Sequence, residues 1–304
     1  MAAARVGATH RDFELPQALR SAFRAAAARW LSTPRRSWTA ASPRLSASVV
    51  LVRDGARGVE VFMQHRVASM ACAPAVWVFP GGGVDPADAL DPAAADAAPD
   101  RWPVLPGLDP HRAGLVLTAA VREVFEECGV LFAGPDLDSV VSDLSHYRWS
   151  TYRASLLDRS ISCAQMLRRE GLVVRYDALT PLARWITPEC EPRRYDTVFF
   201  AATLPPGQHA DGRTSEALTC QWIAADAAVR QHHQGPGTLM PPTLVLAEQI
   251  ARCDTVADYL ASPRTLRAVM PEPVDLGDRL VMRAPIDPDG HASDAGSALG
   301  SGTD

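Results

Sequence analysis

Three glutamates near the middle of the chain have the spacing of a carboxylate cluster. Glu126 and Glu127 follow Glu123 by three and four residues, so all three share one face of a helix. Like charges at these spacings destabilise a helix by about 0.2–0.5 kcal/mol per pair. Arg122 can pair with Glu126, but one arginine does not neutralise three carboxylates. A hard divalent cation, which prefers oxygen ligands, would do so.

Two interpretations of this cluster compete. A solvated acidic surface is the simpler interpretation of glutamates taken alone. A glycine turn upstream favours a metal site instead, because Pro80-Gly81-Gly82-Gly83 directly follows a predicted strand at Val76–Phe79. A backbone without Cβ atoms can come close to a metal ion or a phosphate. We therefore expect the turn and the acidic cluster to form one site.

The helix that carries the cluster is predicted over Leu115–Cys128. Apolar residues recur along it at steps of three or four, as at Leu117, Val121 and Val124. Gly129 follows at the position where a glycine often ends a helix. Each acidic residue in the last turn destabilises the helix by about 0.3–1 kcal/mol through its unfavourable interaction with the helix dipole. A compensating positive charge is therefore expected there.

Further strands and helices are predicted on both sides of this helix. Apolar, β-branched runs at 47–52 and 59–63 flank Asp54-Gly55, which indicates a hairpin. The other predicted elements are two helical pieces within 148–170 that break at 158–162, strands at 183–187, 197–203 and 218–223, and short helices at 244–252 and 256–260. Interleaved strands and helices predict an α/β fold.

Local composition divides the chain into three parts. Residues 1–44 end in a stretch rich in proline and serine, which is typical of a turn or loop. They are predicted to be an N-terminal arm, partly helical or disordered. Residues 45–284 are predicted to form one domain. Within it, residues 84–112 are dense in Pro, Ala and Asp without a regular period, which indicates a surface insertion. Residues 285–304 are predicted to be a disordered tail.

The overall composition excludes several classes of protein. With 304 residues and 47% hydrophobic residues, the chain can bury a substantial core. Its net charge of −5 argues against a nucleic-acid partner, and no apolar run is long enough to span a membrane. Six cysteines without a C-x-x-C pair fit a reducing compartment. We expect a cytoplasmic protein with a small-molecule substrate, for which a homodimer is one option.

The segment Arg122–Val130 resembles the second half of the Nudix signature, G-x5-E-x7-R-E-U-x-E-E-x-G-U, in which U is a bulky aliphatic residue. Every defined position of R-E-U-x-E-E-x-G-U is met. The first half departs from the pattern, because Gly82 followed by five residues reaches Asp88, an aspartate in the place of a glutamate. A further 33 residues, rather than seven, then precede Arg122.

A long insertion at this place is similar to one in the branch of the peroxisomal acyl-CoA diphosphatases. The chain also resembles that branch at Phe79–Gly82, Arg184–Pro188 and Pro192–Phe200. The resemblance covers roughly residues 45–260. It implies a Nudix α/β/α sandwich, with a mixed sheet between the acidic helix and helices nearer the C-terminus and with extra helical insertions.

The family resemblance implies a role for each residue of the matched segment. Glu126 and Glu127 are expected to ligate Mg²⁺, for which Mn²⁺ is a possible substitute. Glu123 is expected either to ligate the ion or to act as the base. Arg122 is expected to orient Glu123 through an ion pair, and the Gly82 carbonyl to add a ligand.

Other site residues follow less directly from the resemblance. The family's acid that pairs with the signature arginine corresponds to Asp88, although the insertion leaves Asp109 as an alternative. Glu216, in the loop before Gln221-Trp222-Ile223, is a further candidate ligand or base. Candidate phosphate- or substrate-binding residues are three arginines: Arg66, Arg193 and Arg194.

The resemblance implies Mg²⁺-dependent hydrolysis of a diphosphate linkage. CoA or acyl-CoA is the expected substrate, which would give 4′-phosphopantetheine or its acyl form and 3′,5′-ADP. Another nucleoside diphosphate derivative, such as ADP-ribose, NADH or a noncanonical nucleotide, is the main alternative. A non-catalytic Nudix-like ligand sensor is disfavoured because all three glutamates are present.

Overall fold

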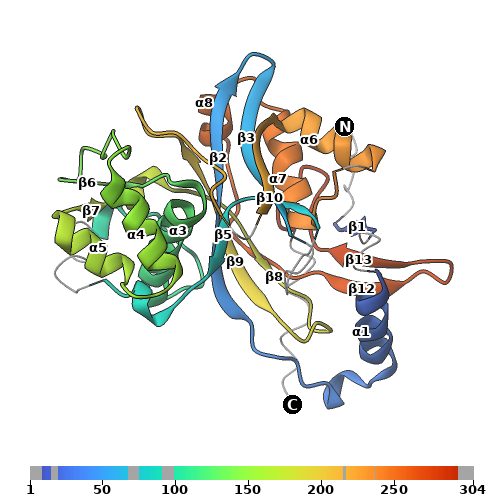
Figure 1. Ribbon diagram of the computed structural model, residues 1–304. Coiled ribbons are helices and arrows are strands. Elements are labelled where there is room, and N and C mark those ends of the chain that lie inside the picture. Colours follow the sequence, from blue (N-terminus) through green and yellow to red (C-terminus); the bar gives the residue numbers. More distant parts are fainter. Residues whose placement is uncertain are drawn as a thin grey trace.

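A mixed sheet forms the centre of the protein (Figure 1). The computed structural model describes residues 9–14, 20–67, 75–90, 99–214, 217–235 and 237–293. The central sheet has the strand order β10-β3-β2-β9-β8-β11. Its strands are β2 (Arg44–Gly55), β3 (Gly58–Arg66), β8 (Thr180–Ile186), β9 (Tyr195–Thr203), β10 (Ala217–Ala224) and β11 (Ala268–Val269).

The strand pairings confirm the predicted mixed sheet. β2 pairs with β9 in parallel from Arg44 opposite Tyr195, and β8 pairs with β11 in parallel. The other neighbours on the main path, including β2 and β3, are antiparallel. The predicted hairpin is therefore present, with Gly55 opposite Gly58 at its turn.

The sheet splits between β2 and β3. These strands pair only over Val52–Gly55 and Gly58–Val61. Farther from the hairpin turn, β3 pairs with β4 (Trp77–Val78) and β2 pairs with β5 (Gly81–Gly83). The glycine run is therefore a short strand wedged into the split rather than a free turn.

Helices cover both faces of the central sheet, as the sandwich prediction requires (Figure 1). The longest helix, α3 (Pro110–Cys128), packs on one face. The other face is covered by α6 (Ala225–Gln234) and α7 (Pro241–Ala251), with α8 (Val256–Ala261) near β2. The fold is thus an α/β/α sandwich with additional helices.

Helix α3 begins earlier than the predicted Leu115 because of a capping signal. The Asp109 carboxylate accepts a hydrogen bond from the Arg112 N–H at 2.9 Å, and Pro110 occupies the first turn. At the other end, Gly129 adopts the left-handed conformation at φ 69°, as its position in the sequence predicts. The acidic cluster therefore lies on the last turns of a long, well-capped helix.

The two helical pieces predicted within 148–170 are α4 (Tyr147–Leu157) and α5 (Cys163–Glu170). Ser162 and Gln165 form a capping box that starts α5, which explains the break. The α4 helix packs on α3, where Trp149 meets Phe125 edge to face at 6.3 Å between ring centroids. Between these helices and β8 lie β6 (Ala133–Gly134), β7 (Val173–Val174) and the 3-10 turn η5 (Tyr176–Ala178).

The N-terminal segment differs from the loose arm predicted for residues 1–44. It contains the expected helix, α1 (Arg20–Ser32), followed by the turn η2 (Arg35–Ser37). However, β1 (Arg11–Phe13) pairs with β13 (Leu280–Ala284) in a second sheet with β12 (Glu272–Asp275). The sequence gives no sign of this because the partner strands lie at the opposite end of the chain.

Side chains also fasten the N-terminal segment to the domain. Arg11 donates to Glu248 of α7 at 2.8 Å, and Phe23 of α1 is buried in the same core as α7. The beginning of the predicted tail 285–304 is likewise ordered: Ile286 is fully buried and bridges to Ala292. Residues 294–304 lie outside the described residues.

No helix within the described ranges has both the length and the apolar character that crossing a membrane would require.

The burial of α1 predicts that Phe23→Ala destabilises the protein by about 3–5 kcal/mol, the usual cost of removing a buried phenylalanine. Leu31→Ala is the control on the same helix, because Leu31 is 43% exposed and should change stability by about 0.5 kcal/mol or less. Urea unfolding of both variants measures the difference. Equal, small effects would show that α1 does not contribute to the core.

Candidate active site

The glycine strand β5 lies directly against the acidic helix. The Gly81 N–H donates a hydrogen bond to the Glu127 Oε2 atom at 2.9 Å. A Cβ atom on Gly82 would lie 2.5 Å from the Glu123 carboxylate, and one on Gly81 would strike the backbone of β2. A side chain at Gly81 would require the backbone of β2 to move, and one at Gly82 would displace the Glu123 carboxylate, so the Cβ-free segment expected beside the cluster is present.

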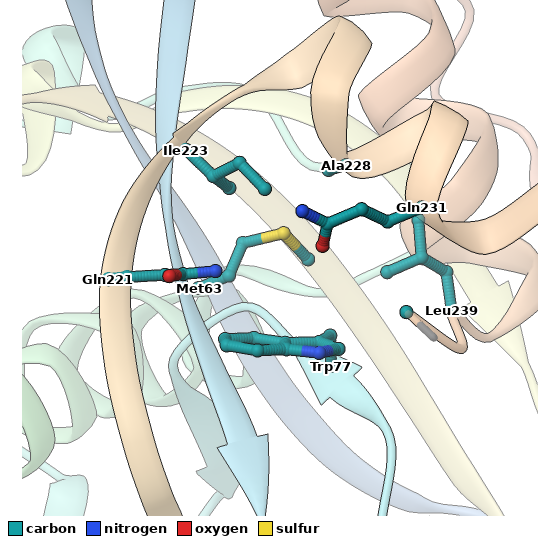
Figure 2. A pocket seen from close by; sticks show the side chains of 8 residues that line it. Met63, Trp77, Gln221, Ile223, Ala228, Gln231 and Leu239 are labelled. Carbon is teal, nitrogen blue, oxygen red and sulfur yellow. The ribbon is translucent and has the colours of Figure 1, made fainter. Parts of the chain in front are cut away.

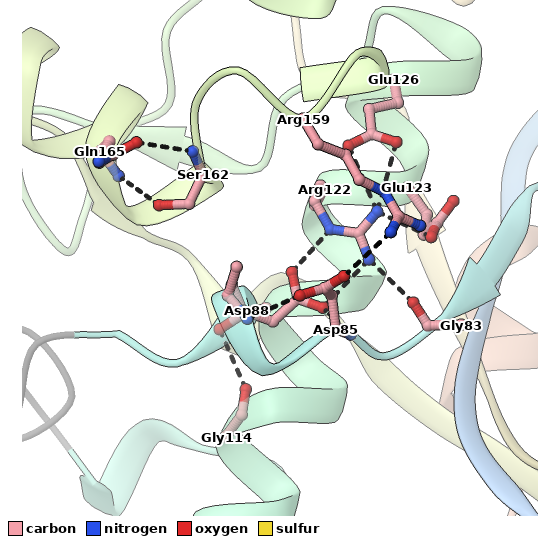
Figure 3. A network of polar contacts seen from close by, with 12 residues as sticks. Gly83, Asp85, Asp88, Gly114, Arg122, Glu123, Glu126, Arg159, Ser162 and Gln165 are labelled. Carbon is pink, nitrogen blue, oxygen red and sulfur yellow. Dashed lines mark hydrogen bonds and ion pairs between the residues drawn. The ribbon is translucent and has the colours of Figure 1, made fainter. Parts of the chain in front are cut away.

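One arginine connects the carboxylates (Figure 3). Arg122 donates from Nε and Nη2 to the two carboxylate oxygens of Asp88, at 2.6 and 3.0 Å. Its Nη1 atom donates to Glu123 at 2.8 Å and to both oxygens of Glu126 at 3.3 Å. Its Nη2 atom also reaches the Gly83 carbonyl at 2.9 Å. The guanidinium thus joins three acidic residues to β5.

The structure decides between the two candidate partners of Arg122. Asp88 ends a short turn, η3 (Pro86–Asp88), which is held by a capping box between Asp85 and Asp88. Asp88 is almost fully buried and binds Arg122 at two points, whereas Asp109 only caps α3. The first residues of the predicted surface insertion 84–112 therefore belong to the site.

Burial determines the electrostatics of the cluster. Glu123, Glu126 and Glu127 are 9%, 6% and 3% exposed. Burial raises the pKa of Glu123 to about 7, against the opposing charge of Arg122. Burial alone would lower the pKa of Arg122, but its hydrogen bonds and ion pairs raise that pKa above its ordinary value. Arg122 is therefore permanently charged, while Glu123 can exchange a proton near neutral pH.

The compensating charge expected at the end of α3 comes from Arg153 on α4. Its Nε and Nη2 atoms donate to the Glu126 carbonyl at 3.3 and 3.2 Å, and its Nη1 atom to Asp211 at 2.9 Å. The Asp211 N–H in turn bonds to the Cys128 carbonyl at 2.8 Å. The segment 148–170 is thus more than a surface decoration, and no local sequence signal identified Arg153.

The donor set of the cluster suits a hard divalent cation. Four buried carboxylates, those of Asp88, Glu123, Glu126 and Glu127, lie beside the glycine strand, where a Cβ atom on Gly82 would meet Glu123. Within the described residues, no three His, Cys, Asp or Glu side chains are already arranged as a metal site. Glu123 and Glu126 bind Arg122, and Glu127 binds the Gly81 N–H. The residues fit the cation chemically, but binding requires their contacts to change.

The other predicted site residues have different outcomes. The prediction that Arg194 binds phosphate is corrected by the structure. Arg194 is buried, and its guanidinium donates to the carbonyls of Thr187 and Ala41 and contacts the Met270 sulfur, so it is not available for phosphate. Arg193 is exposed before β9, and Arg66 ends β3. Their roles stay predictions. Glu216 lies outside the described residues.

Comparisons with known proteins agree with this geometry. A family model described as the NUDT19 Nudix domain matches residues 113–249, which contain the whole acidic segment. The "Putative nudix hydrolase 7" of Caenorhabditis elegans is 27% identical over 251 residues, which cover 78% of this chain and 71% of that protein.

A solved structure shows the fold. The crystal structure of a NUDIX hydrolase from Alicyclobacillus acidocaldarius superposes with a TM-score of 0.63 at 23% identity, over 73% of this chain and 96% of that one. At this identity the likeness concerns the arrangement of the elements.

The contact between Gly82 and Glu123 predicts that Gly82→Ala lowers catalytic activity by about 100-fold, a loss typical of disturbing the shell around a metal site. Gly83→Ala is the matched control, because nothing lies within 4 Å of its added Cβ. Steady-state kinetics and thermal unfolding of both variants measure the difference. Two equally active variants would contradict the close approach.

Proposed function

We propose that the chain is a Nudix hydrolase and that it hydrolyses the diphosphate linkage of CoA or an acyl-CoA, a proposal supported by the family model and by the relative from Caenorhabditis elegans. The observation that carries the proposal is the buried cluster of Glu123, Glu126 and Glu127, held between Arg122 and a glycine strand. A solvated acidic surface would have none of these contacts. The presence of all three glutamates also favours an enzyme over a ligand sensor.

Glu126 and Glu127 are the proposed ligands of Mg²⁺ or Mn²⁺, with Glu123 as a third ligand or as the base and the Gly82 carbonyl as a further ligand. A divalent cation held there would neutralise the charge of the diphosphate and lower the pKa of water. Glu123 suits the role of base because burial raises its pKa above the ordinary value of a glutamate, so its carboxylate binds a proton more strongly than an exposed one.

Asp88 is proposed to keep Arg122 in position while the cation binds and the glutamates change their contacts. Its two hydrogen bonds use the Nε and Nη2 atoms of the guanidinium, whereas the contacts with Glu123 and Glu126 use Nη1. The Nη1 contacts can therefore change while the arginine stays anchored. Asp88 thus acts as a positioning residue.

Arg159 is the proposed phosphate-binding residue, in the place of Arg194. It lies in the loop between α4 and α5, and Figure 3 shows its side chain extending toward Asp85. The two side chains are 3.7 Å apart, and the Arg159 side chain is 84% exposed. Because this ion pair is weak, the Arg159 side chain can rotate toward a bound diphosphate. The N–H groups of its planar guanidinium can then donate hydrogen bonds to the phosphate oxygens.

The backbone of Arg159 supports this proposal. Its φ is 60°, in the left-handed region that residues other than glycine rarely adopt. Such conformations persist where the surrounding structure imposes them, and they concentrate at functional sites. Here the left-handed residue directly follows Asp158, the C-cap of α4, and its side chain lies beside Asp85.

The choice of CoA is supported by the split signature and by the match to the NUDT19 Nudix domain. The products would be 3′,5′-ADP and 4′-phosphopantetheine or its acyl form. ADP-ribose, NADH and noncanonical nucleotides are the alternative substrates, since the carboxylate cluster acts on the diphosphate that they share with CoA.

We expect the purified protein with Mg²⁺ to release phosphomonoesters from CoA or acyl-CoA faster than from ADP-ribose, NADH or dinucleoside polyphosphates. Glu126→Gln should lower the rate by about 100-fold or more while the protein stays folded. Glu60→Gln is the control, because Glu60 pairs with Arg53 on the β2–β3 hairpin.

Three outcomes of this panel contradict the proposal in different ways. No turnover of any compound refutes the activity, a preference for ADP-ribose refutes the CoA assignment, and full activity of Glu126→Gln refutes its role as a ligand.

Arg159→Ala should raise KM by about tenfold with a smaller change in kcat, because a charged hydrogen bond to substrate contributes about 1.5–3 kcal/mol. Arg168→Ala is the matched control, since it removes the same charge from an exposed position on α5. The KM of the wild type should also rise with salt more steeply than that of Arg159→Ala. Equal KM values for the two variants would remove Arg159 from the site.

A further inference from the structure

The loop that follows β9 passes the C-terminal end of α3. In the central sheet β9 and β10 are separated by β2 and β3, so the chain has to cross two strands between them. Residues 204–214 form the described part of this crossing. The Asp211 N–H donates to the carbonyl of Cys128, the residue after Glu127, at 2.8 Å. The loop therefore lies against the turn of α3 that carries the proposed cation ligands.

The loop is fastened on both sides of this contact. Before it, the side chain of the buried Gln208 accepts a hydrogen bond from the Leu131 N–H at 2.8 Å and donates to the Leu131 carbonyl at 2.9 Å. After it, β10 pairs with β3 and packs Gln221 and Ile223 beside Trp77 (Figure 2). The hollow left there is only about 10 Å³, the space of one water molecule. The loop is thus tied both to the segment after α3 and to the sheet.

The guanidinium of Arg153, on α4, joins this loop to α3. Its Nη1 atom donates to Asp211 at 2.9 Å. Its Nη2 atom donates both to the Arg213 carbonyl of the loop at 3.3 Å and to the Glu126 carbonyl of α3 at 3.2 Å. Because one nitrogen serves both carbonyls, the loop and the last turn of α3 are neighbours here. The Arg153 side chain is 12% exposed, so these bonds are largely shielded from water.

Gly129 makes room for this guanidinium. A Cβ atom on Gly129 would lie 2.8 Å from the Nη1 atom of Arg153 and 3.4 Å from the Asp211 carboxylate. The glycine therefore serves the left-handed end of α3 and also the close approach of Arg153. The Glu126 carbonyl is one of the last four of α3, which a helix leaves without partners of its own. Arg153 supplies that partner.

We propose that Arg153 is a positioning residue of the cation site. By holding the Glu126 carbonyl and the loop with one guanidinium, it fixes the last turn of α3 and so directs the carboxylates of Glu126 and Glu127. This inference rests on the proposed function, because these glutamates are its cation ligands. Arg153 lies outside the signature segment and acts through the backbone of α3, without contacting the substrate.

The charge of Arg153 and the geometry of its hydrogen bonds have opposite effects on a cation. A positive side chain near the carboxylates repels a cation, so its removal would strengthen cation binding if charge alone mattered. Loss of the hydrogen bonds would instead release the last turn of α3 and weaken cation binding. The sign of the change therefore separates the two roles.

The test measures the affinity of the full chain for Mn²⁺ without substrate, by electron paramagnetic resonance of the free ion. Arg153→Met raises the Kd for Mn²⁺ by about tenfold or more, the usual effect of removing a group that orients metal ligands. Arg153→Lys keeps the charge but lacks the planar fork of donors, so it recovers only part of the affinity. Arg148→Met is the matched control on α4, because the Arg148 side chain is 49% exposed and pairs with Glu170. It leaves the Kd unchanged.

Three results would overturn the proposal. Unchanged or tighter Mn²⁺ binding by Arg153→Met shows that the hydrogen bonds do not position the ligands. A higher KM for the substrate with unchanged kcat shows that Arg153 binds substrate, whereas positioning lowers kcat at a given Mn²⁺ concentration. If Arg153→Met does not fold, Arg153→Lys and Asp211→Asn decide, and wild-type Mn²⁺ affinity in both refutes the role.

Cation binding needs no hydrolysis, so the measurement separates this inference from the proposed function. Weaker Mn²⁺ binding by Arg153→Met, in a protein that cleaves no diphosphate, supports the positioning role and refutes the activity. Cleavage of CoA by Arg153→Met with the kcat and Mn²⁺ dependence of the wild type supports the activity and refutes the positioning role. A wild type that binds no Mn²⁺ refutes the proposed ligands and this role together.

Discussion

The buried ion pair between Arg122 and Asp88 is the interaction on which the site depends. Three acidic residues of α3 come together near the negative end of the helix dipole, and burial makes their mutual repulsion stronger than in water. Arg122 offsets part of this repulsion, and it can do so only because Asp88 holds its guanidinium from the other side. Removing one partner would leave an uncompensated buried charge, which is strongly destabilising.

This ion pair also explains how the signature segment tolerates a long insertion. The 33 residues between Asp88 and Arg122 include the first part of α3, and the closure cost of the connection before α3 grows only with the logarithm of its length. The two-point contact between Arg122 and Asp88 can offset a cost that grows so slowly. The capping box of η3 fixes Asp88 locally, so the residues beyond it need not hold the site together.

Local signals in the sequence predicted the parts of the fold and site that depend on neighbouring residues. Gly129 and Asp54-Gly55 predicted the C-terminal end of α3 and the β2–β3 hairpin, and the break before α5 was expected within residues 158–162. Contacts between distant segments were predictable only where the family signature joins them, as between the glycine run and Glu127. The choice of Asp88 over Asp109, the burial of Arg194 and the pairing of β1 with β13 all depend on tertiary packing.

The split in the central sheet has a thermodynamic consequence. The segment from Trp77 to Gly81 fills this split, and Gly81 at its end holds the Glu127 carboxylate. Because β4 and β5 are already paired into the sheet, a cation that binds beside them has little backbone entropy to remove. Only the side-chain contacts of the carboxylates have to change when it binds.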